Sequence, residues 1–212
     1  MGGRHVRKMV RRMESGEPVR VAPAMATMKK LTRLAFYAEQ FGYAYADVRQ
    51  GGGPQGHGYV LMLVPDPRPE ARERAARNRA LYPEAGSGGA LPPLDPGALA
   101  LLKARITFDL TTLYSEGQRV LLAGIGLVPL AVPVGILLGT GGTAFLYGGA
   151  AWLVLMGIVP AGFALTRRYR TRYAALLEAA GYTPVTDREG RLRYVPPGGQ
   201  LPGHGNPFTV RR

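Results

Sequence analysis

The chain contains no cysteine, so structural disulfides and thiolate metal sites are excluded. Histidine is scarce as well: His5, His57 and His204 lie far apart and lack the spacing typical of metal ligands. We expect these histidines to be solvated loop residues. The composition therefore predicts neither a bound metal nor a cofactor.

Residues suited to catalysis are also few. The only serines, Ser15, Ser87 and Ser115, do not lie in a nucleophile elbow or beside a histidine. Residues 51–56 match the glycine pattern of a dinucleotide-binding loop, but a strand rather than a helix is expected to follow them. We interpret this segment as a hairpin loop. The sequence proposes no catalytic residue, and we expect a protein that is not an enzyme.

Charge is absent from one long segment. The 47 residues from 120 to 166 include no Asp, Glu, Lys, Arg or His. As a single helix they would extend about 70 Å, whereas a bilayer's hydrocarbon core is about 30 Å thick. The glycine-rich break at residues 139–142 divides the segment into residues 120–138 and 143–165, each about one bilayer long. This predicts a transmembrane helical hairpin over residues 119–166.

Arginines flank this hairpin on both sides, while its turn is uncharged. Lys103, Arg105 and Arg119 precede it, and a cluster of four arginines follows it. The positive-inside rule then places both termini in the cytoplasm, with the hairpin in the cell inner (plasma) membrane. We expect the cluster to contact anionic lipid headgroups, because each basic residue near such a surface gains about 1 kcal/mol. Nucleic acid is the less favoured partner, because no aromatic stacking platform or reader motif accompanies the charge. The cluster comprises Arg167, Arg168, Arg170 and Arg172.

Small residues recur at four-residue spacing in both spans and predict close helix packing. They are Ala131, Gly135 and Gly139 in the first span, and Gly157 and Ala161 in the second. Packing within the hairpin is the first interpretation, and homodimerisation through the same faces is the second. Because no charged or amide side chain lies within the run, the hairpin is expected to be an anchor rather than a conduit.

The remaining residues carry a formal net charge of +13 and predict a small cytoplasmic α+β domain with two β-hairpins. Residues 1–27 are expected to form a disordered basic tail, and translation could start at Met1 or at Met28. Residues 28–118 form an α+β region. Its expected elements are helices over 31–41 and 69–82, strands over 43–49 and 59–64, and a helix that begins at Asp95 and Pro96.

The helix beginning at Asp95 has an apolar stripe, which we assign to the domain core or, alternatively, to a coiled-coil seam. Residues 167–196 are predicted to form a helix and a second β-hairpin. Because an isolated hairpin is only marginally stable, both hairpins are expected to join one antiparallel sheet. Residues 197–212 form a tail rich in proline and glycine.

Three segments, residues 31–50, 99–110 and 182–208, resemble uncharacterised two-span integral membrane proteins of high-GC actinobacteria. This resemblance implies the two-span architecture and carries no known activity. The leading hypothesis is a non-enzymatic, membrane-anchored interaction or scaffold protein with a basic cytoplasmic domain. Its partners would be the anionic inner leaflet and either a second copy or another membrane protein. The alternative is an accessory subunit of a transporter or pore that oligomerises through Gly135 and Gly139.

Overall fold

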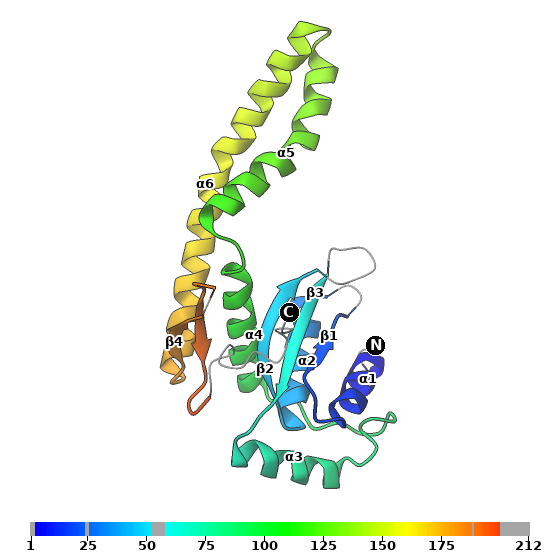
Figure 1. Ribbon diagram of the computed structural model, residues 1–212. Helices are drawn as coiled ribbons and strands as arrows, with labels where there is room; N and C mark the ends of the chain where they lie inside the picture. The colour runs from blue at the N-terminus through cyan, green and yellow to red at the C-terminus, as the bar shows by residue number, and fades with distance from the viewer. Residues whose placement is uncertain (1–2, 24–25, 52–57, 188, 200–212) are drawn as a thin grey trace, which may run out of the picture. The chain divides into compact units, whose positions relative to one another are not determined.

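The computed structural model describes residues 3–23, 26–51, 58–187 and 189–199, which form an α+β fold with six helices and two small sheets (Figure 1). The chain divides into two compact units. One unit is discontinuous and combines Met1–Leu110 with Tyr173–Arg212, and Thr111–Arg172 form the other. The elements are α1 Gly3–Met13, β1 Val19–Val21, α2 Met28–Gln40, β2 Tyr43–Gln50, β3 Tyr59–Pro65, α3 Pro69–Leu81, α4 Pro96–Thr111, α5 Glu116–Leu138, α6 Gly142–Ala179, β4 Thr183–Thr186 and β5 Leu192–Val195.

The main core of the discontinuous unit lies between a three-stranded antiparallel sheet and its helices. The strand order is β1-β3-β2, and α2 lies across one face of this sheet (Figure 1). Leu61 and Leu63 of β3 are fully buried there together with Leu31 of α2. A β-bulge in β2 adds Ala46 between Tyr45, which pairs with Leu63, and the next paired residue.

The elements predicted between residues 28 and 111 are confirmed. The side chain of Thr27 accepts a hydrogen bond from the Lys30 amide at the start of α2. At the start of α4, the Asp95 side chain accepts one from the Gly97 amide at 2.9 Å. Gly42 ends the α2 segment with a φ of 87°, a conformation that favours glycine.

The prediction of a disordered tail over residues 1–27 is wrong for the described part of that segment. Residues 3–13 form α1, whose apolar side chains are buried in the main core: Val6, Met9, Val10 and Met13. Strand β1 then pairs with β3, with Val19 opposite Leu63. The physical reason is amphipathicity, because one face of this highly charged segment is apolar and packs on the sheet. The segment before Met28 is therefore part of the domain core.

Helix α4 is buried on two faces, which supports its assignment to the core. Leu102 and Ile106 lie in the main core, whereas Ala104 and Phe108 lie in a second cluster with Leu177 and Tyr194. The rings of Phe108 and Tyr194 meet edge to face at a centroid distance of 4.9 Å.

The second β-hairpin forms as predicted, but the expectation of one shared sheet is wrong. β4 and β5 form a separate two-stranded sheet. Side chains of α4 and α6 supply its packing partners. Tyr194 of β5 belongs to the second apolar cluster and donates a hydrogen bond to Glu178 of α6 at 2.6 Å. A hairpin that packs on helices in this way needs no third strand.

The second unit contains α5 and most of the antiparallel helix α6, and both helices are long and apolar enough to cross a membrane. α5 begins at a capping box in which Ser115 and Gln118 bond reciprocally to backbone amides. α6 extends to Ala179, so the helix expected after the second span is its continuation. No glycine or proline interrupts residues 163–179, which explains the continuity. Of the proline- and glycine-rich tail, residues 200–212 lie outside the described residues.

Candidate functional site

The surface of the helical hairpin is apolar and exposed. Of the most apolar stretches of α5 and α6, only 11% and 0% are buried. Leu137 and Phe145 are 84% and 85% exposed. The core helix of a soluble protein would bury such side chains, so this surface requires another apolar environment.

The two helices approach each other closely at the small residues of the first span. A Cβ atom added at Gly135 would overlap the carbonyl oxygen of Ala144, and one added at Gly139 would lie 2.7 Å from the Ala144 amide nitrogen. Ala131 is buried on the same face. Gly157, in contrast, has open space beside its Cα, and Ala161 is exposed. Three of the five predicted packing residues therefore lie in the interface between α5 and α6, here called the seam.

A hydrogen bond also joins the two helices of the hairpin. The indole Nε1 of Trp152 in α6 donates to the carbonyl oxygen of Gly124 in α5 at 2.9 Å. A polar bond of this kind in an otherwise apolar pair fixes which residues face each other.

The four arginines after the uncharged run do not share one environment. Arg168 and Arg172 are exposed and Arg170 is partly buried. Arg167 donates to both carboxylate oxygens of Glu116, at 2.9 and 3.1 Å, in an exposed ion pair that joins the first turn of α5 to α6. Exposed pairs of this kind contribute little stability, so this contact does little more than orient Arg167.

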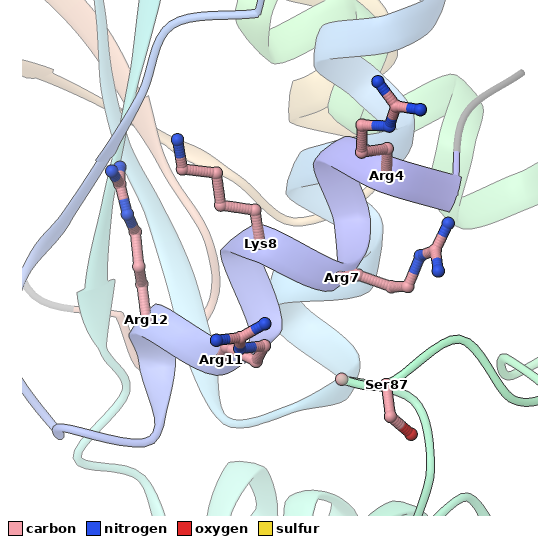
Figure 2. Close-up of a pocket in the computed structure, with 7 residues that line it drawn as sticks. Arg4, Arg7, Lys8, Arg11, Arg12 and Ser87 are labelled. Carbon is pink, nitrogen blue, oxygen red and sulfur yellow. The ribbon is translucent and has the colours of Figure 1, made fainter.

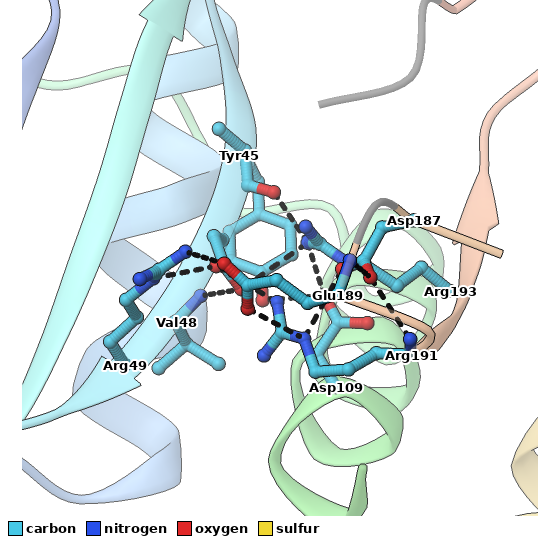
Figure 3. A network of polar contacts seen from close by, with 10 residues as sticks. Tyr45, Val48, Arg49, Asp109, Asp187, Glu189, Arg191 and Arg193 are labelled. Atoms are coloured by element: carbon cyan, nitrogen blue, oxygen red, sulfur yellow. Dashed lines mark hydrogen bonds and ion pairs between the residues drawn. The ribbon is translucent and has the colours of Figure 1, made fainter. Parts of the chain in front are cut away.

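A buried polar network joins the two chain segments that flank the hairpin (Figure 3). Arg193 of β5 contacts Asp109 of α4 at 2.9 Å and Asp47 of β2 at 3.4 Å. The Tyr45 hydroxyl donates to the same Asp109 oxygen at 2.8 Å. The side chains of Arg193 and Asp109 are only 4% and 1% exposed, so removing either partner would leave the other charge buried and poorly compensated.

The outer part of this network is less buried and brings in the turn of the second hairpin. Arg191 contacts Asp47 at 3.0 Å and Asp187 at 3.2 Å, while Arg49 contacts Glu189 at 3.1 Å. Burial raises the pKa of Tyr45 well above its usual range, and the negative charge of Asp109 raises it further. Every acid and base here has a structural partner, so the network is a clasp between β2, α4 and β5.

A basic surface on α1 was missed by the sequence analysis. Five cationic side chains project from the exposed side of this helix (Figure 2). Together with Gly86 and Ser87 they line a hollow of about 710 Å³, here called the α1 hollow. The cationic residues are Arg4, Arg7, Lys8, Arg11 and Arg12.

The charges in the α1 hollow lack acidic partners within the described part of the chain. None of the ion pairs among the described residues involves α1, and α1 itself contains no acidic residue. Neighbours at three- and four-residue spacing therefore repel one another, at about 0.2–0.5 kcal/mol per pair at low salt. The helix dipole disfavours Arg4 in the first turn and favours Arg11 and Arg12 in the last. The unpaired positive charge along the helix favours an anionic ligand.

The loop that faces α1 is held close to its arginines. Ala85 is buried in the main core and anchors the loop. A Cβ atom added at Gly88, where φ is 124°, would lie 2.8 Å from Arg7 Nη1. At Gly86 it would lie 3.3 Å from Arg11 Cγ. The sequence carried a readable signal for this site, because the apolar residues of α1 recur with helical spacing between the basic ones.

Comparisons with protein-family models, with curated proteins and with solved structures find no match to this chain.

Proposed function

We propose that this chain is a two-span integral membrane protein of the cell inner membrane that holds a basic α+β domain at the cytoplasmic surface. There the domain acts without catalysis, as a scaffold that contacts anionic lipid and a protein partner. One observation carries the proposal: a single folded unit is built from both segments that flank an apolar, exposed helical hairpin.

The discontinuous unit constrains how the hairpin can be threaded. Arg193 and Asp109 lie on opposite sides of the insert in the sequence, yet they form a buried ion pair. Because the unit folds as one body, its two segments must lie on the same side of a membrane. The chain between them then crosses an even number of times, and two spans satisfy this requirement.

The side of the membrane follows from charge. The discontinuous unit contains most of the basic residues, and the turn of the hairpin carries none. The positive-inside rule therefore favours a cytoplasmic domain. The exposed Arg168 and Arg172, with Arg167 and Arg170, supply basic residues suited to anionic headgroups.

The helix seam favours an anchor over an oligomerising accessory subunit. Gly135 and Gly139 already pack against α6 of the same chain, where an added Cβ would meet Ala144. Both glycines therefore pack within one hairpin and are not available for contact with a second copy. The hypothesis of an oligomerising subunit relied on that contact.

Single-cysteine labelling tests this proposal directly, because the natural chain contains no cysteine. T140C places a thiol at the exposed hairpin turn, whereas S15C and T186C place one on each segment of the domain. In spheroplasts, a membrane-impermeant maleimide should label T140C at once, and the other two variants only after permeabilisation. Labelling of S15C and T186C from opposite sides, or release of the chain by alkaline carbonate, would refute the proposal.

A further inference from the structure

We infer that the α1 hollow is a binding site for the phosphate group of an anionic phospholipid. The inference rests on the proposed function, because the membrane anchor is what keeps a lipid surface within reach of the domain. The observation that carries it is the set of five cations without acidic partners in the described chain, gathered around one hollow against a loop that the buried Ala85 anchors.

The donors in the hollow suit a phosphate group. Lys8 and Arg11 make no side-chain hydrogen bond to any residue that the structure describes, and Arg7 bonds only to the Gly3 carbonyl oxygen at 3.3 Å. Guanidinium groups bind phosphate oxygens in a bidentate manner, and an ammonium adds a mobile point charge. Arg7 and Arg11 lie one helical turn apart, so a single tetrahedral anion can bridge them. Such a ligand would also relieve the repulsion along the helix.

An adjoining apolar pocket favours a lipid over a nucleic acid. This pocket, of about 270 Å³, shares Gly86 with the α1 hollow and is lined by Val10, Met13, Phe41 and Tyr82, with Glu14 and Arg79 as its charged members. A phospholipid presents an anionic group next to hydrocarbon, which matches a cationic surface beside an apolar one. The hollow itself has no aromatic side chain, although single-stranded nucleic acid needs one for base stacking.

The test uses the full chain in neutral detergent and a fluorescent short-chain phosphatidylglycerol, with binding measured by fluorescence anisotropy. The R7Q/R11Q variant should weaken binding at least tenfold. The matched control R72Q/R77Q removes the same charge from exposed positions of α3 and should stay within twofold of the unmodified chain. Unlabelled phosphatidylglycerol should compete, whereas phosphatidylcholine should not.

Folding of the variants is checked by thermal unfolding. R7Q/R11Q should unfold at or above the temperature of the unmodified chain, because it removes a like-charge pair from exposed positions. R4Q/K8Q provides a second pair on the same helix and should reproduce the weaker binding. If both pairs leave binding unchanged, or weaken it no more than R72Q/R77Q does, the inference is wrong.

Further competition experiments test other classes of ligand. They also separate a failure of this inference from a failure of the proposed function. Equal competition by inorganic pyrophosphate would identify a soluble phosphate site, and stronger competition by single-stranded RNA a nucleic-acid site; both outcomes overturn the lipid inference. If R168Q/R172Q abolishes binding and R7Q/R11Q does not, lipid contact belongs to the arginine cluster, and the proposed function survives alone. If the cysteine labelling fails while R7Q/R11Q still weakens binding, the site exists without the proposed topology.

Discussion

Removing the carboxylate of Asp109 should open the clasp that joins the two segments of the discontinuous unit. D109A leaves the Arg193 guanidinium, only 4% exposed, with Asp47 at 3.4 Å as its remaining carboxylate. It also removes the acceptor of the Tyr45 hydroxyl. Breaking a buried pair by deleting one partner costs about 3–5 kcal/mol when the other charge is left uncompensated, and the longer contact with Asp47 places D109A toward the lower end of that range. This is a large fraction of the 5–15 kcal/mol that stabilises a typical domain.

Urea unfolding of the full chain in detergent measures this cost. Near-UV circular dichroism of the tyrosines reports mainly on the domain, because eight of the eleven tyrosines lie in the discontinuous unit. The matched comparison is D95A, which removes the exposed cap of α4 and should cost about 1 kcal/mol.

A double variant separates charge burial from the loss of packing. Replacing both partners, in D109L/R193M, should cost less than D109A alone, because no buried charge is left unpaired. A cost below about 1 kcal/mol for D109A, or strictly additive effects in the double variant, would refute the interpretation of this network as a clasp.

Three further predictions concern the core, the seam and pH. M9A removes a side chain that is 1% exposed and should lower the free energy of unfolding by about 2–5 kcal/mol; no measurable loss in urea unfolding would contradict the burial of α1. G135I should separate the hairpin helices and shift the fluorescence of the single tryptophan, whereas G157I, at an open position, should not; identical spectra would argue against the seam. Desolvation opposes ionisation of Asp66, but hydrogen bonds from Arg68 outweigh it and lower its pKa. The stability from this pair should be present above the unfolded-state pKa of about 3.9 and be lost as pH falls below it, and D66N should flatten the acid limb of a pH-unfolding curve.

The sequence alone determined the elements whose cause is local. The uncharged run is too long for one crossing of a bilayer, so its division at the glycine-rich turn follows from composition and length. The helix predicted over residues 31–41, the two strands that follow it and the start of α4 follow from periodicity, caps and breakers. Each of these properties is visible within a window of about 20 residues.

The candidate sites were also predictable from the sequence only in part. The four arginines and the small residues of the hairpin could be found by position, but their partners could not: Glu116 is 51 residues from Arg167 along the chain. The apolar spacing of α1 was readable, yet the charge density of that segment concealed it. Whether an amphipathic segment forms a stable helix depends on the surface against which it packs.

Tertiary structure alone decided that β1 joins β3, that the second hairpin forms its own sheet, and that Arg193 pairs with Asp109. Arg193 and Asp109 are separated by 84 positions in the sequence, with the whole hairpin between them. Pairing between such distant groups depends on loop closure and on the summed burial of many side chains, neither of which leaves a mark on local spacing. For that reason the sequence predicts a membrane hairpin, while the folded chain reveals that its two flanks are one body.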